Sequence, residues 1–241
     1  MHFFSATDIG TSRQTNQDAY FNAVLSPNAV LCIVCDGMGG ANAGNIASQT
    51  AVNIISDYIK RSFMPDMKPN SVKNMILSAV DSANTEILHL ANNNPNYEGM
   101  GTTAVVALVV SDKAYIAHVG DSRAYLINDN TITQITNDHS MIQSLIENGH
   151  LTPEEARFHP KRNIITRAIG IKDTISTDFI DIDLNEGILF LFTDGVSNVV
   201  TPENILEFVN NTQLSGVPEE VIKFANNSNS GDNVTVTVVS K

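Results

Sequence analysis

The apolar residues of this chain form short runs near the N-terminus and then two longer patterns with helical spacing. Apolar or alternating stretches at residues 2–9, 19–25 and 29–35, separated by Gly, Ser, Pro and Asn, predict three β-strands. Apolar positions then recur every three or four residues over 46–59 and 71–91. This spacing predicts two amphipathic helices.

The second half begins with strand patterns that a long polar stretch interrupts. Residues 137–168 are polar and partly helical, carry three histidines and two prolines, and are the best candidate for a mobile flap. Strands are predicted on both sides of this flap at 102–110, 114–119, 123–127, 132–135, 175–184, 188–193 and 234–238, and helices at 202–210 and 218–226. Because strands and helices arrive in blocks, we expect an α+β sandwich over a doubly wound parallel sheet. The lack of repeats or linker-like composition predicts one domain spanning 1–241.

Composition narrows the class of protein. The chain has 241 residues, 42% of them apolar, and no apolar run long enough to span a membrane or to form a signal peptide. We therefore expect a soluble, cytoplasmic protein, with a monomer as the default. The formal net charge of −12 and the lack of a basic stripe argue against a nucleic-acid partner.

Two cysteines, Cys32 and Cys35, lie within a predicted buried strand. A spacing of three places them on opposite faces of that strand, and the chain has no second cysteine pair to complete a zinc site. We expect buried, unreactive thiols.

Four aspartates share one setting at the ends or beginnings of apolar strands: Asp36, Asp121, Asp194 and Asp232. Each taken alone is compatible with a simple Asp-Gly or Asp-Asn turn. Strand ends that meet at one edge of a sandwich would bring four carboxylates together, which is costly unless a cation balances them. An all-oxygen ligand set predicts magnesium or manganese, and this many acids make two ions plausible.

Two further features lie close to these aspartates in the sequence. Asp36 is followed by Gly37-Met38-Gly39-Gly40, where glycines let the backbone approach a ligand and expose carbonyl groups. Arg13 stands shortly before Asp18, and a guanidinium there is suited to clamp a phosphate group opposite the metals.

These motifs, taken in order, resemble bacterial protein phosphatase 2C enzymes, which are PPM-type metal-dependent serine/threonine phosphatases. The series spans nearly the whole chain and comprises Arg13-Gln14-Thr15-Asn16-Gln17-Asp18, Asp36-Gly37-Met38-Gly39-Gly40, Gly101-Thr102-Thr103, Gly120-Asp121-Ser122-Arg123, Asp138-His139-Ser140, the stretch 162–170 from Arg162 to Gly170, Thr193-Asp194-Gly195 and Gly231-Asp232-Asn233.

The resemblance implies an α-β-β-α sandwich of two antiparallel sheets with a binuclear metal centre at one end. By motif match, Asp36 would bridge two manganese or magnesium ions, Gly37 would offer its carbonyl, and Asp194 and Asp232 would complete the protein ligands. Asp121 resembles the position of a third, weaker metal. Arg13 would hold the substrate phosphate, and Asp18 would act close to the metals, partly through water.

The resemblance further implies a signalling enzyme, a phosphoprotein phosphatase that opposes a bacterial serine/threonine kinase. A metal-activated water would attack phosphoserine or phosphothreonine in line, without a phosphoenzyme. Met38 stands where better-known relatives have a histidine, so a metal-bound water or a flap histidine such as His139 would protonate the leaving group. The acidic balance of the chain favours phosphosites with basic surroundings. Rival functions are a metal phosphodiesterase and a non-catalytic phosphoprotein-binding relative.

Overall fold

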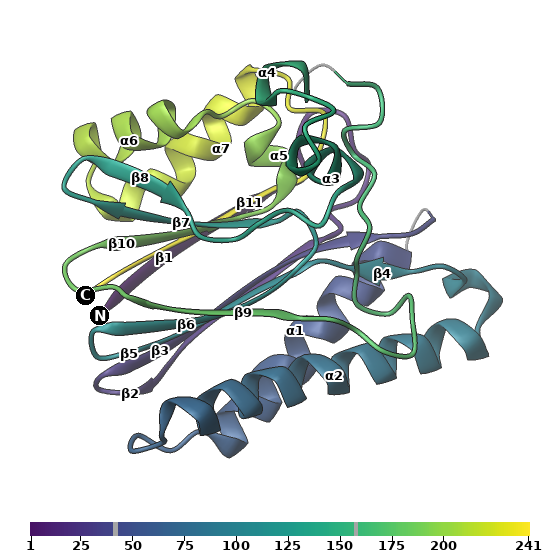
Figure 1. Cartoon of the computed structure of the whole chain (residues 1–241), viewed down its shortest axis with the longest axis horizontal. Coiled ribbons are helices and arrows are strands. Elements are labelled where there is room, and N and C mark those ends of the chain that lie inside the picture. Colours follow the sequence, from purple (N-terminus) through teal and green to yellow (C-terminus); the bar gives the residue numbers. More distant parts are fainter. Residues whose placement is uncertain (41–42, 157–158) are drawn as a thin grey trace.

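Two antiparallel β-sheets lie face to face in the computed structural model of the chain, which describes residues 1–40, 43–156 and 159–241 (Figure 1). The first sheet has the order β1 (His2–Asp8), β11 (Val234–Ser240), β10 (Ile188–Phe192), β7 (Arg123–Asn128) and β8 (Thr131–Gln134). The second has the order β2 (Asp18–Ser26), β3 (Ala29–Met38), β5 (Ala104–Val110), β6 (Lys113–Val119) and β9 (Asp178–Asp183), with the short β4 (Gly101–Thr102) paired to β3.

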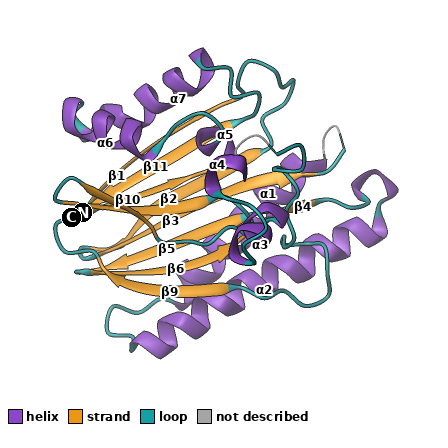
Figure 2. Cartoon of the chain, turned by 45° about the horizontal axis from the view of Figure 1, so that its top comes forward, coloured by secondary structure: helices purple, strands orange, loops and turns teal. Residues whose placement is uncertain are grey.

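Helices cover the outer face of each sheet (Figure 2). The second sheet carries α1 (Ala43–Ser62) and α2 (Pro69–Asn93), and the first carries α6 (Pro202–Asn211) and α7 (Val217–Asn227). Shorter elements are α3 (Met141–Glu147), α4 (Pro153–Ala156), α5 (Asp194–Ser197) and the 3₁₀ turns Pro95–Tyr97 and Leu214–Gly216. The predicted α-β-β-α sandwich is thus confirmed.

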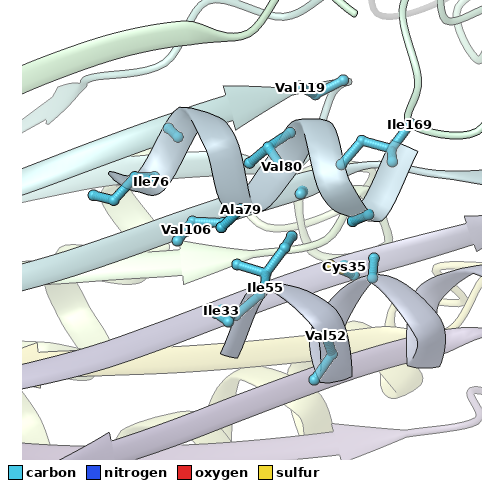
Figure 3. Packing of buried hydrophobic residues seen from close by; sticks show 14 of the residues in the cluster. Ile33, Cys35, Val52, Ile55, Ile76, Ala79, Val80, Val106, Val119 and Ile169 are labelled. Carbon is cyan, nitrogen blue, oxygen red and sulfur yellow. The ribbon is translucent and has the colours of Figure 1, made fainter. Parts of the chain in front are cut away.

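Three apolar layers hold these elements together. The middle layer, between the sheets, contains Val30, Val105 and Leu191. In one outer layer the side chains of Ile33 and Val106 face Ile55 of α1 and Val80 of α2 (Figure 3). The alternation of side chains along a strand makes this possible, because each central strand buries both of its faces.

Both cysteines behave as the sequence predicts. Cys32 lies in the layer between the sheets, and Cys35 lies on the opposite face of β3, toward the helices. They are free and fully buried, and burial raises the pKa of both thiols. They are therefore unreactive core residues.

Several strand boundaries differ from the prediction by one to three residues, and two of the differences have a visible cause. The strand predicted at 102–110 is split, because the Thr103 hydroxyl replaces a main-chain partner and accepts the Asp36 N–H at 2.9 Å. The strand predicted at 175–184 begins only at Asp178, where pairing with His118 of β6 starts, while the carbonyl of Ser176 accepts a bond from Arg167.

The predicted flap corresponds to the connection between β8 and β9, which contains α3 and α4. Residues 157 and 158 of this segment lie outside the described residues. The loops that carry β4, α3 and α5 gather at the end of the sandwich opposite the two termini (Figure 1). None of the helices described is both long enough and apolar enough to cross a membrane.

Candidate metal centre

Asp18 and Asp36 stand directly opposite each other where β2 and β3 meet the loop end of the second sheet. Asp18 is only 8% exposed, and Asp36 is half-buried. The Asp36 carbonyl is fixed by the Thr103 N–H at 2.8 Å and the Thr102 hydroxyl at 2.9 Å. The strand pairing therefore places two carboxylates side by side on a rigid support.

The first sheet reaches this point through two threonines. The hydroxyls of Thr193, after β10, and Thr235, in β11, donate to Asp18 Oδ2 at 2.8 and 2.7 Å. The other carboxylate oxygen of Asp18, Oδ1, is buried and has no hydrogen-bond partner among the described residues. Asp18 thus joins the two sheets with one oxygen and keeps the other for a ligand.

Asp194 and Asp232 approach the same point from the first sheet. Asp194 directly follows Thr193 and opens α5, and its Oδ1 is also buried without a partner in the described chain. The Asp194 and Asp36 carboxyls lie close enough to influence each other's pKa. Asp232 lies just before β11, and its Oδ2 accepts a bond from Arg13 Nη2 at 2.7 Å.

Asp121 follows β6 and is 9% exposed. Burial, with the charges of Asp194 and Asp138 added, raises the pKa of Asp121 to about 8. This interaction with Asp194 indicates that Asp121 faces the same cluster. All the aspartates predicted for the site, together with Arg13, are therefore brought together.

The crowding of buried carboxylates carries an electrostatic cost, which raises their pKa values. Burial is the main cause that raises the pKa of Asp18 to about 7 and that of Asp194 to about 6, and neighbouring aspartates add to both shifts. The pKa of Asp36 is raised well above its ordinary value by burial and then by the charges of Asp18, Asp194, Asp121 and Asp232. Together with the two orphaned oxygens, this cluster of oxygen ligands fits divalent cations such as manganese or magnesium.

Gly37 is required by close packing rather than by its dihedral angles. A Cβ atom at this position would lie 2.0 Å from the Gly44 carbonyl oxygen and 2.7 Å from that of Gln17. The Gly37 N–H donates to Gln17 O at 3.0 Å. Only glycine lets the start of α1 close over the strand end beside Asp36.

A second cluster of possible ligands comprises His118, His139 and Asp178. Here Arg167 Nη1 already lies 2.9 Å from His139 Nε2 and 2.7 Å from Asp178 Oδ1. Because a guanidinium holds this position, the geometry favours a hydrogen-bonded network over a metal site. His118 is fully buried, and its ring is tilted against that of His139 at a centroid distance of 4.6 Å.

His139 is poorly suited to donate a proton to a leaving group. Its Nδ1 accepts the Gly120 N–H at 3.0 Å, and its Nε2 lies 3.1 Å from Asp178 Oδ2. Burial lowers the pKa of His139. Both ring nitrogens are thus committed within the protein.

Sequence reasoning missed the residues that support the aspartates. Besides Thr193 and Thr235, Asn233 accepts the Gln17 N–H and donates to the carbonyls of Ile9 and Thr15. This amide ties the loop that carries Arg13 to the strand end that carries Asp232. The one available signal was position, since Thr193 adjoins Asp194 and Asn233 adjoins Asp232, whereas Thr235 lies three residues beyond Asp232.

Comparisons with known proteins support this geometry. The family model described as protein phosphatase 2C matches residues 10–229. Protein phosphatase PhpP of Streptococcus pneumoniae is 38% identical over 236 residues, covering 97% of this chain and 95% of that protein.

The solved structure of the serine/threonine phosphatase Stp1 from Staphylococcus aureus superposes with a TM-score of 0.93 at 35% identity, covering 99% of this chain and 94% of that one. The chain belongs to the protein phosphatase 2C family. The predicted family is confirmed, and with it the prediction of an enzyme that hydrolyses phosphoproteins.

A further protein phosphatase 2C relative bears on the metal. The catalytic domain of the serine/threonine phosphatase PstP, whose structure contains two manganese ions, superposes with a TM-score of 0.86 at 28% identity, covering 99% of this chain and 97% of that one. Manganese or magnesium is the metal that this family uses, in agreement with the oxygen ligands gathered here.

Proposed function

We propose that this chain is a manganese- or magnesium-dependent serine/threonine phosphatase that hydrolyses phosphoserine and phosphothreonine by in-line attack of water, without a phosphoenzyme. The observation that carries the proposal is the convergence of Asp18, Asp36, Asp194 and Asp232 with Arg13 at one end of the sandwich. Buried carboxylates at this density are a ligand set for cations, and the arginine supplies a phosphate-binding group.

The ligand roles follow from position. Asp36 is central, since the charges of the other four aspartates all act on it, and it would be the residue shared by two ions. Asp194, Asp232 and the Gly37 carbonyl would complete the protein ligands, and Asp121 would hold a third, weaker ion. When bound, the ions supply Lewis-acid polarisation of the phosphoryl group and lower the pKa of a water molecule.

Asp18 would stabilise the metal site rather than contact the substrate phosphate. One of its oxygens is used by two threonine hydroxyls, and the orphaned Oδ1 is free to accept a bond from an ordered water. Those hydroxyls belong to fully buried threonines that already donate to Asp18. Neither is placed as a nucleophile, which supports direct attack by water.

Arg13 is placed to bind the substrate phosphate. Its side chain is 49% exposed and pairs with Asp232, whose carboxylate would be neutralised by cation binding. The guanidinium is then available to bind two phosphate oxygens and to orient the phosphorus for attack.

The substrates we propose are phosphorylated proteins, and the cognate partner is a serine/threonine protein kinase. The names of PhpP and Stp1 support this substrate class. The test is phosphate release from a phosphothreonine peptide by the purified protein with manganese, with EDTA, and with manganese after Asp36→Asn substitution. Metal-dependent turnover that the substitution abolishes supports the proposal. Binding of the peptide without turnover at any divalent metal would favour the non-catalytic alternative, and cleavage of a diester instead would favour the phosphodiesterase.

A further inference from the structure

A cavity of about 440 Å³ opens beside the metal-binding end, between β3 and the segment that leads from the flap to β9. Its wall combines apolar side chains with two basic ones. The residues that matter here are Met38, Ile165, Arg167, Ile171, Lys172 and Ile175.

The cavity is continuous with the catalytic end through Met38. Met38 is the second residue after Asp36, and β4 pairs with this stretch of β3 at Gly37 and Met38. A Cβ atom placed on Gly101 would lie 2.9 Å from both Met38 Cε and Ile171 Cδ1. The two apolar side chains therefore come together over Gly101, directly beside the strand end that carries Asp36.

The wall of the cavity is held in place by a buried amide. Asn84 of α2 is 2% exposed, accepts the Gly170 N–H at 2.7 Å and donates to the Lys172 carbonyl at 2.8 Å. Ile171 lies between these two anchored residues, and yet the residue is 41% exposed. An apolar side chain held out to solvent by a fixed backbone is suited to contact a partner.

Arg167 presents an unused edge in the same cavity. Its Nη1 donates to the Ser176 carbonyl and to Asp178 Oδ1, and lies 2.9 Å from His139 Nε2. Nε and Nη2, which form the side-on fork of a guanidinium, have no partner among the described residues. That fork matches the two oxygens of a carboxylate.

Lys172 adds a second positive charge. It is exposed, and within the described part of the chain it forms no ion pair. Arg167 is paired with Asp178, so Lys172 leaves a net positive charge on this wall, which stands out in a chain with a net charge of −12. This local charge points to an acidic occupant, the opposite of the preference expected from the overall charge.

We infer that this cavity binds substrate residues next to the phosphorylated one and selects an acidic side chain accompanied by an apolar one. The inference rests on the proposed function, because it assigns a specificity site to that reaction. The acidic side chain would take the Arg167 fork and the charge of Lys172, and the apolar one would cover Met38 and Ile171.

The test compares phosphothreonine peptides that differ at one position. Each peptide carries Glu, Gln or Lys at one position, with Leu or Ala as the next residue. In successive peptides this pair of residues stands one position further from the phosphothreonine, on its N-terminal or its C-terminal side. For each peptide kcat/KM is measured with manganese and divided by kcat/KM for p-nitrophenyl phosphate, which has no flanking residues to enter the cavity.

The variants are Lys172→Glu, the milder Lys172→Gln, and Lys223→Glu as a control for net charge. Lys223 is an exposed residue on α7 and lies outside the cavity. At one position the wild type should prefer Glu over Lys roughly tenfold, because Glu would form a partly exposed ion pair there, whereas Lys would meet a like charge. Lys172→Glu should lose or invert this ratio, and Lys223→Glu should keep it.

Ile171→Ser tests the apolar half, and it should remove the preference for Leu over Ala. Equal rates for Glu, Gln and Lys at every position, a preference for Lys in the wild type, or equal effects of Lys172→Glu and Lys223→Glu would each overturn the inference. Absence of turnover on p-nitrophenyl phosphate by the wild type would instead refute the proposed function, so the two failures are distinguishable.

Discussion

Asp18→Asn is predicted to stabilise the metal-free protein while weakening its metal site. Asparagine has almost the same shape, and its amide oxygen can accept the bonds that Thr193 and Thr235 now donate to the carboxylate. The amide NH₂ would then take the place of the orphaned Oδ1, where it can donate to a neighbouring carboxylate. The substitution thus removes one negative charge from a cluster that repels itself.

The magnitude follows from the pKa of Asp18. Burial and its neighbours raise this pKa to about 7 from 3.8, so ionisation above pH 7 costs the folded state on the order of 4 kcal/mol relative to the unfolded chain. The two threonine hydroxyls bond less strongly to a neutral amide oxygen than to a carboxylate, which reduces the expected stabilisation by about 1–2 kcal/mol. A net stabilisation of about 2 kcal/mol corresponds to a rise in Tm of roughly 5 °C for a chain of this size.

The assay is thermal unfolding at pH 8 in EDTA and again with manganese. We expect Asp18→Asn to melt above the wild type in EDTA, and manganese to raise its Tm less than that of the wild type. Asp183→Asn, which removes an exposed carboxylate from β9, controls for net charge. Equal or lower stability of Asp18→Asn in EDTA would refute the electrostatic reasoning.

Three further predictions concern glycine, pH and arginine. Gly37→Ala should destabilise the protein by about 3 kcal/mol or more, because its Cβ would overlap the Gly44 carbonyl, whereas Gly40→Ala, with nothing described within 4 Å, should leave the Tm nearly unchanged. In EDTA the Tm should fall as pH rises from about 5 to 8, because carboxyls with a raised pKa keep their protons in the folded state at low pH and lose them through this range. A flat or rising Tm in calorimetry would contradict the raised pKa values of Asp18, Asp121 and Asp194. Arg13→Ala should lower kcat/KM for phosphopeptides roughly 10- to 100-fold through loss of charged hydrogen bonds to the phosphate, and unchanged steady-state kinetics would remove Arg13 from the site.

The sequence was informative wherever an aspartate adjoins a strong strand pattern. Asp36, Asp194 and Asp232 each lie next to an apolar run and a glycine or asparagine, so their position at a sheet end followed from local pattern alone. The block order of strands and helices likewise predicted the layered fold. The sequence pattern predicted one strand over 102–110, and the structure divides it into β4 and β5 at Thr103, one residue after the predicted start.

Contacts between distant segments were beyond local pattern. The bonds from Thr193 and Thr235 to Asp18 join residues 175 and 217 positions apart, and they depend on how two sheets pack. The four-residue helix α5, which begins at Asp194, is too short to show helical periodicity. The unused fork of Arg167 depends on which nitrogen its neighbours occupy, which the sequence does not encode locally.

Manganese binding at equilibrium tests the central claim most directly. Free Mn²⁺ is followed by its electron paramagnetic resonance signal during titration of the metal-stripped wild type, Asp36→Asn and the exposed-site control Asp57→Asn. We predict two tightly bound ions in the wild type and in Asp57→Asn, and loss of tight binding in Asp36→Asn. No tight binding by the wild type, or the same number of ions in Asp36→Asn, would contradict a metal centre built on these aspartates.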